Sequence, residues 1–286
     1  MKNPSLWTPI ETDSESLLNQ YPQPLKTLVE GEVPAFIMRN AFNADHCAAI
    51  VDRFYKRELL YDPRVSLKDN EPVPRIDIGT SLGMRHHNRE EFFAHAASTH
   101  KLFDSLFKGY DNPVDFIYKK IEAIVPDKRV MVARELDGRL YGPAIFRTYY
   151  EGMGHEPHFD SVRNRTRLLD MQVSRFDKQF AAILCFQESL FDDEKGQTLL
   201  YRRQWSPELN EKLFNFPSSI WRSYAEEQGI EHVSINLKPG DFYIFCSETV
   251  HELPPTKGER PRIVLAVFFA MSDEDEEVYV LSLIHI

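Results

Sequence analysis

The chain has 286 residues, of which 42% are hydrophobic and 27% are charged, and its formal net charge is −10. This composition is sufficient for one large core, while the negative charge argues against a nucleic-acid partner. Three cysteines without paired spacing favour a reducing compartment. We see no apolar signal segment at the start of the chain, and the longest apolar run, Ile263–Met271, is too short to span a bilayer. We therefore expect a cytoplasmic protein.

The first 128 residues are predicted to form a mostly helical support. Helical periodicity and capping residues predict three helices that pack on the outside of a β core. Residues 60–88 between them are rich in prolines and predict loops. The predicted elements are a short strand at Val33–Met38, a helix from Asn43 or Asp45 to about Glu58, and helices at Arg89–Phe107 and Pro113–Ile124.

From Arg129 onward the pattern changes to short strands separated by turns. Such a series predicts a mainly β, α+β fold whose core is a double-stranded β-helix, that is, a cupin-like jelly roll. We expect one domain over residues 1–286, with the core at 129–272, a tail at 273–286 and a partly helical insert at 202–232, which either covers a substrate or is a surface excursion. The predicted strands are Val130–Arg134, Ala144–Tyr150, Phe180–Gln187, Gln197–Tyr201, Val233–Leu237, Phe242–Phe245 and Ile263–Phe269.

Two histidines and an aspartate have the spacing of metal ligands. In a strand, residues i and i+2 point to the same side, so His158 and Asp160 can direct two donor atoms at one point while Phe159 faces the other way. His251, delivered at or just beyond the end of the strand Phe242–Phe245, can complete the set. Two histidines and one carboxylate suit a single ferrous ion with an open face. A loop histidine held by hydrogen bonds is the competing explanation for the tripeptide alone.

Arg262 stands directly before an apolar strand. A buried arginine needs an anion, and its guanidinium group matches a carboxylate. We therefore predict that Arg262 binds the far carboxylate of a 2-oxo acid whose other end chelates the metal. Arg260 has the same parity and is the competing candidate. Either Tyr149 or Tyr150 could donate to the same cosubstrate or orient a metal ligand, and packing in the core is the competing explanation.

Together these residues resemble the motif of the Fe(II)/2-oxoglutarate-dependent dioxygenases. That motif has a tyrosine and a glycine before a His-x-Asp pair, then a distal histidine followed by an arginine or lysine. The overall pattern is similar to the cyanobacterial halogenases of indole alkaloids and to their hydroxylase relatives that act on N-substituted amino acids. The resemblance implies an oxidoreductase of natural product biosynthesis that uses Fe(II), 2-oxoglutarate and dioxygen. The matching residues are Tyr149, Gly152, His158, Asp160, His251 and Arg262.

The resemblance also implies a reaction. The related halogenases have Gly or Ala in place of the carboxylate ligand, which opens a position for chloride, whereas this chain has Asp160. Hydroxylation of an unactivated C–H bond is therefore expected, with desaturation or oxidative ring closure, as in kainoid synthases, as the alternative. The chain departs from the family at Val264, where a hydroxyl residue often stands. A non-catalytic metal- or carboxylate-binding barrel and a cupin-like metal-dependent hydrolase or isomerase stay open as other classes.

Several further residues are candidates for binding the substrate. Arg163 and Arg165 follow the metal motif and could bind carboxylates, although a solvated loop with weak salt bridges is the competing explanation. Arg147 lies on the predicted strand that precedes the motif. Trp221 and Phe216 in the insert could supply an apolar wall. We expect a small, amino-acid-like substrate that carries carboxylates, and no membrane partner.

Overall fold

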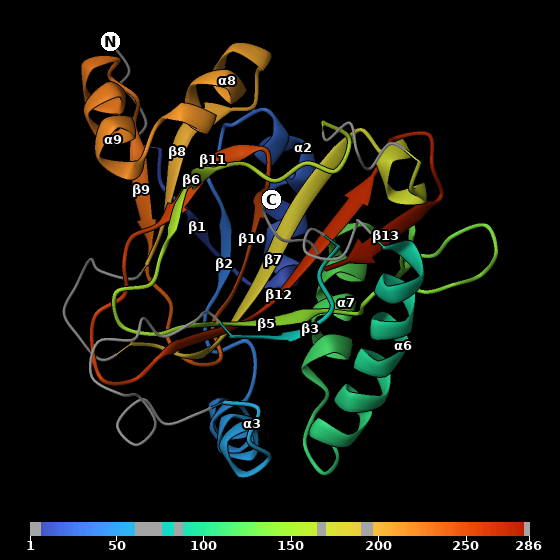
Figure 1. Ribbon diagram of the computed structural model, residues 1–286. Coiled ribbons are helices and arrows are strands. Elements are labelled where there is room, and N and C mark those ends of the chain that lie inside the picture. The colour runs from blue at the N-terminus through green and yellow to red at the C-terminus, as the bar shows by residue number, and fades with distance from the viewer. Residues whose placement is uncertain (1–6, 61–75, 83–87, 165–169, 190–196, 283–286) are drawn as a thin grey trace.

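The computed structural model describes residues 7–60, 76–82, 88–164, 170–189 and 197–282, and two β-sheets form its centre (Figure 1). In the larger sheet the strands run in the order β1-β2-β10-β7-β12-β13-β4, with β5 beside β12 and β3 beside β5. The larger sheet consists of β1 (Ile10–Glu11), β2 (Phe36–Met38), β3 (Ile76–Gly79), β4 (Arg129–Val132), β5 (Ile145–Tyr149), β7 (Lys178–Gln187), β10 (Phe242–Cys246), β12 (Arg262–Met271) and β13 (Glu277–Leu281).

The smaller sheet faces the larger one across a hydrophobic core. Its order is β6-β11-β8-β9, so strands that neighbour one another are far apart in the chain. This arrangement of two facing sheets with flanking helices confirms the predicted α+β, jelly-roll fold. The smaller sheet consists of β6 (His155–His158), β8 (Thr198–Gln204), β9 (His232–Ile235) and β11 (Thr249–Leu253).

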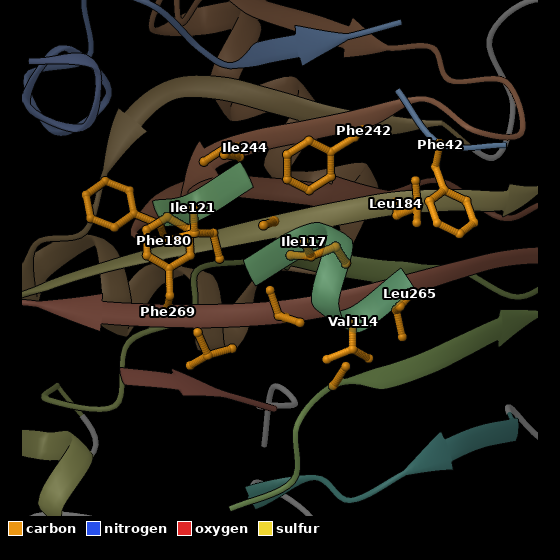
Figure 2. Packing of buried hydrophobic residues seen from close by; sticks show 14 of the residues in the cluster. Phe42, Val114, Ile117, Ile121, Phe180, Leu184, Phe242, Ile244, Leu265 and Phe269 are labelled. Carbon is orange, nitrogen blue, oxygen red and sulfur yellow. The ribbon is translucent and has the colours of Figure 1, made fainter. Parts of the chain in front are cut away.

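Apolar residues cover both faces of the larger sheet. In β12, Leu265 and Phe269 belong to the outer core, whereas Val264 and Phe268 belong to the core between the sheets. Figure 2 shows Ile117 and other apolar residues of α7 over the outer face. The helices that contribute residues to this outer core are α1 (Ser14–Gln20), α2 (Pro24–Val29), α3 (Ala44–Lys56), α6 (Arg89–Leu106) and α7 (Pro113–Ile124).

The predicted helix starts are confirmed by their caps. The side chain of Asn43 accepts a hydrogen bond from the backbone of Asp45 at 2.8 Å, and Asn112 caps α7 in the same way through Val114 at 2.9 Å. Such caps satisfy backbone N–H groups that have no partner within the helix. None of the described helices has the length and apolar character needed to cross a membrane.

The insert at 202–232 contains two helices, α8 (Pro207–Asn215) and α9 (Ser218–Glu227), as predicted. They lie beside β8, β9 and β11, against the outer face of the smaller sheet (Figure 1). A third apolar core forms between these helices and that face. It contains Phe159, Tyr201, Leu209, Leu213, Trp221, Ala225, Ile230 and Val250.

The β structure extends beyond the predicted limits of 129–272. Glu277–Leu281, within the predicted tail at 273–286, forms β13 between β12 and β4. Val278 and Val280 enter the outer core, while Tyr279 and Leu281 enter the inner core, so this strand is buried on both faces. Within the predicted loops at 60–88, Ile76–Gly79 forms β3. Residues 283–286 of the predicted tail lie outside the described part of the chain.

Candidate metal centre

Two adjacent strands of the smaller sheet bring the predicted ligands together. His158 at the end of β6 and His251 in β11 are direct partners in the antiparallel register. Asp160 follows β6, and its backbone N–H donates to the carbonyl of Ser247 at 2.8 Å. One ligand atom from each of these three buried residues lies within 4.8 Å of the other two. The Oδ2 atom of Asp160 is 3.8 Å from Nε2 of each histidine.

Hydrogen bonds orient both imidazole rings toward the same point. Nδ1 of His158 lies 2.6 Å from the carbonyl oxygen of Glu156, and Nδ1 of His251 lies 2.8 Å from that of Thr249. Each Nδ1 is therefore the N–H donor, which leaves Nε2 to ligate a metal. Burial lowers the pKa of His251, against the opposing effect of Asp160, and favours a neutral ring. Two imidazoles and one carboxylate fit a divalent transition metal.

The route of the chain to His251 differs from the prediction. His251 was expected at or just beyond the end of the strand Phe242–Phe245, but it lies in the middle of a separate strand of the other sheet. A short turn at Ser247 and Glu248 carries the chain between the sheets. The backbone N–H of Ser247 donates to Gln179, and its hydroxyl donates to the carbonyl of Asp160 at 2.9 Å. The same turn therefore positions a second ligand.

His155 lines the cavity beside His158 because β6 contains an irregularity. Four residues of β6, from His155 to His158, span the same stretch as three residues of β11, from Leu253 to His251. The extra residue turns both histidine side chains toward the interior, and their rings are 4.3 Å apart. His155 lies outside the group of three potential ligands.

The other end of the cavity carries the predicted carboxylate-binding residues. Arg262 and Tyr149 are register partners on β12 and β5, and both line the same cavity as His158 and His251. The guanidinium group of Arg262 is buried, lies 5.8 Å from the centre of the Tyr149 ring, and contacts Oγ1 of Thr198 at 3.5 Å. Among the described residues no carboxylate pairs with it. A buried cation in this position favours an anionic ligand.

Arg147 places a second guanidinium group in the cavity. It lies on the same face of β5 as Tyr149 and 5.5 Å from the centre of the Phe268 ring. Burial opposes its charge, but Tyr149, Asp77 and Asp160 together raise the pKa of Arg147. It therefore stays cationic, and the cavity is lined by two arginines as well as by His155, His158 and His251.

Two hydroxyl residues of the site were missed by the sequence analysis. Thr198 on β8 and Tyr243 on β10 line the cavity, and the Tyr243 hydroxyl donates to Thr198 Oγ1 at 3.3 Å. Burial raises the pKa of Tyr243, so it remains a donor. Val264, the position where the family often has a hydroxyl, also lines the cavity. The inward parity of Thr198 on a strand with Leu200 is the signal that could have found it.

Other predicted residues lie away from the cavity. Arg260 and Arg163 are exposed on the surface. Trp221 is fully buried on the outer face of the smaller sheet, where its ring lies 5.3 Å from that of Tyr201, and Phe216 packs against the same core. Arg165 lies outside the described residues. The substrate-binding roles of these residues therefore stay predictions.

Comparisons with known proteins agree with this geometry. A family model described as the carrier-protein-independent halogenase WelO5 matches residues 8–282. An N-substituted L-amino acid dioxygenase from Burkholderia ambifaria AMMD has a similar structure, with a TM-score of 0.58, 13% identity and 90% of each chain covered. Its complex with alpha-ketoglutarate gives a TM-score of 0.55 at 14% identity, again over 90% of each chain.

A third solved structure, the non-heme alpha-ketoglutarate-dependent carbocyclase SnoK from nogalamycin biosynthesis, gives a TM-score of 0.53. It is 8% identical, and the match covers 95% of this chain and 99% of the carbocyclase. At these identities the likeness shows a shared fold. None of the curated proteins is similar enough in sequence to count as a match.

Proposed function

Because the chain belongs to the family of the carrier-protein-independent halogenase WelO5, we propose that it is an Fe(II)- and 2-oxoglutarate-dependent oxygenase that hydroxylates a C–H bond of a small metabolite carrying a carboxylate. One observation carries the proposal. His158, Asp160 and His251 form a metal-ligand set on the smaller sheet, and the two histidines line the same cavity as the buried Arg262 of the larger sheet. Family membership confirms the enzyme class that the motifs predicted.

Separate groups of residues would bind the iron and the cosubstrate. His158, Asp160 and His251 would hold the iron, and Arg262 would hold the far carboxylate of 2-oxoglutarate. When bound, the iron and the 2-oxo acid supply the oxidation of a C–H bond by dioxygen, with succinate and carbon dioxide as co-products. Apolar residues of the core between the sheets, such as Ile183 and Phe268, also line this cavity and would limit the entry of water during the reaction.

The carboxylate of Asp160 favours hydroxylation over halogenation. It is fully buried and lies at equal distance from both imidazoles, in the position of a third ligand. Related halogenases have Gly or Ala at the matching position, where chloride binds instead. A carboxylate here leaves no such position, so this member of a halogenase family is proposed to transfer oxygen. Ring closure or desaturation is the alternative, because both begin with removal of a hydrogen atom.

The second arginine of the cavity supports a substrate with a carboxylate. Arg262 is sufficient for the far carboxylate of one cosubstrate, and Arg147 adds a buried guanidinium group near the metal ligands. A guanidinium group in the cavity wall can donate to a substrate carboxylate in addition to the aspartates beside it. N-substituted amino acids are the first class to test, since a dioxygenase of the same fold acts on them.

The test is succinate formation from 2-oxoglutarate by anaerobically purified protein with Fe(II), after oxygen is admitted. A panel of acidic and N-substituted amino acids serves as substrates, and His158→Ala is the control. Succinate formation that a substrate stimulates and the control lacks is expected. In the product mass, a gain of one oxygen indicates hydroxylation, a loss of two hydrogens indicates ring closure or desaturation, and a gain of chlorine would contradict the role of Asp160. Failure to bind Fe(II) and 2-oxoglutarate would overturn the proposal.

A further inference from the structure

We propose that helix α9 of the insert positions the metal ligands from the outer face of the smaller sheet, with Glu156, Glu252 and Arg222 as the positioning residues. This inference rests on the proposed function, since it assumes that the ligand set binds a metal. It assigns the insert, which the sequence left open between a substrate cover and a surface excursion, a third role. The helix would act as a brace for the two strands that carry the histidines.

The first connection runs from His158 to the start of α9 through Glu156. The carbonyl of Glu156 accepts the hydrogen bond from Nδ1 of His158. The carboxylate of the same residue accepts from the backbone N–H of Ser218 and, at 2.5 Å, from the Ser218 hydroxyl. Ser218 begins α9, where free N–H groups and the helix dipole favour a negative charge. One residue thus joins a metal ligand to the first turn of the helix.

The second connection runs from His251 to the middle of α9 through Glu252. The carboxylate of Glu252 is fully buried, and the two oxygens accept from Nε and Nη2 of Arg222, each at 3.0 Å. The Tyr201 hydroxyl donates to the same carboxylate. A buried carboxylate is costly without a cationic partner, and a guanidinium fork fixes its orientation. The residue next to His251 is therefore held from the helix side.

Apolar contacts reinforce both connections. Phe159, which stands between two ligands in the sequence, enters the third core together with Trp221 of α9, as its predicted orientation away from the metal requires. Val250, which precedes His251, enters the same core. On both strands, ligands therefore alternate with residues that the insert holds from behind.

Through these contacts the spacing of the two histidines depends on helix α9. The two strands pair directly at His158 and His251, but their register shifts between His251 and Leu253, immediately beside the histidine pair. Helix α9 contacts residues close to each histidine in the sequence, and it thereby constrains the distance between the two rings. Partners behind the ligands orient them and tune metal affinity, so the effect of the brace should be visible in metal binding itself.

The test compares cobalt binding by Arg222→Met and by the unmodified protein. Arg222→Met keeps the apolar stem and removes the fork. Co²⁺ is titrated into metal-free protein, at a temperature where circular dichroism shows both proteins folded. We expect cobalt affinity to fall by about 10- to 100-fold, with a changed visible cobalt spectrum that reports altered ligand geometry. Arg222→Lys should recover part of the affinity, because it restores the charge without the fork.

Arg202→Met is the matched control, since it breaks an exposed 2.6 Å ion pair with Glu231 in the same insert. It should change cobalt affinity by less than about twofold, because surface pairs contribute little. Unchanged cobalt affinity and spectrum in folded Arg222→Met would overturn the proposal. If Arg222→Met does not fold, Glu252→Gln, which keeps the size and the acceptor, must show the loss instead, and unchanged affinity there overturns the proposal equally. If the unmodified protein binds cobalt no better than His158→Ala does, the proposed function itself fails.

Discussion

The two sheets of this protein support the two ends of the cavity in different ways. The smaller sheet carries the histidine ligands on its inner face, and its outer face is held by a small core and by charged contacts with one helix. The larger sheet carries Arg147 and Arg262 on its inner face, and its outer face is covered by a large apolar core. The metal end, formed by the smaller sheet, therefore has directional contacts behind it, and the carboxylate end, formed by the larger sheet, has a large apolar core behind it.

This difference has a physical basis. Metal ligands must be placed within a fraction of an ångström, so directional contacts behind them are useful. A guanidinium group on a long side chain can adjust to its anion, and needs only a firm strand beneath it. A substitution at one end of the cavity should therefore leave ligand binding at the other end unchanged.

The largest effect is expected for the metal ligands. His158→Ala should abolish succinate formation and weaken Co²⁺ binding at least a few hundredfold, because one ligand of a tight site contributes roughly 3–4 kcal/mol if the binding free energy is shared evenly. His155→Ala is a close control, since its ring also lines the cavity but lies outside the ligand set. Calorimetric cobalt titrations compare the two variants. An equal loss in both would mean that the ligand set is assigned wrongly.

The next effect concerns the outer core of the larger sheet. The Phe146 ring lies 4.8 Å from those of both Phe54 and Phe186, so Phe146→Ala leaves a cavity. The free energy of unfolding should fall by about 3–5 kcal/mol in urea denaturation, while the folded variant should keep its cobalt affinity. Leu136→Ala, at a position that is 89% exposed, should change stability by less than about 0.5 kcal/mol. A marked loss of cobalt binding in Phe146→Ala would show that the two sheets are not independent.

The carboxylate end is tested by the two arginines. Arg262→Leu should weaken 2-oxoglutarate binding to the metal-loaded protein by about 30-fold or more, since losing a buried charged partner costs about 2–5 kcal/mol. Cobalt affinity should stay unchanged. Arg147→Leu should instead raise the KM of a carboxylate substrate and leave 2-oxoglutarate affinity within about threefold, the effect of less than about 1 kcal/mol. If both variants weaken 2-oxoglutarate binding equally, the proposed division of roles between the arginines is wrong.

The ligand set could be predicted because its chemistry and its spacing are both local. The i, i+2 relation of His158 and Asp160 needs only an extended chain, and Arg262 before an apolar strand is a visible anomaly in the sequence. The alternation of apolar residues likewise predicted most strands of the core. What the sequence could not supply was the side of the sheet on which a segment lies.

Trp221 illustrates this limit. An aromatic residue in an insert was interpreted as the wall of a substrate pocket, but its ring packs on the outer face of the smaller sheet. Helical periodicity shows that a segment has an apolar side, and does not show which of two sheet faces will receive it. The link between Arg222 and Glu252 was missed for a similar reason, since thirty residues separate them and no local pattern joins them.

The smallest effect concerns Thr198, a residue of the smaller sheet that contacts Arg262. Its hydroxyl lies between Arg262 and Tyr243, where the family's usual hydroxyl position is occupied by Val264. Thr198→Val removes one neutral hydrogen-bonding group at nearly constant size, so 2-oxoglutarate affinity should fall by about fivefold, or about 1 kcal/mol, with cobalt affinity unchanged.

The double variant Thr198→Val with Val264→Thr returns a hydroxyl to the cavity from the larger sheet. If Thr198 holds the guanidinium group of Arg262 in place, this exchange should recover most of the lost 2-oxoglutarate affinity, as measured by the same titration. Unchanged affinity in Thr198→Val alone would mean that Arg262 is positioned by its own strand and by Tyr149. The carboxylate end would then belong entirely to the larger sheet, and the separation of the two ends would be complete.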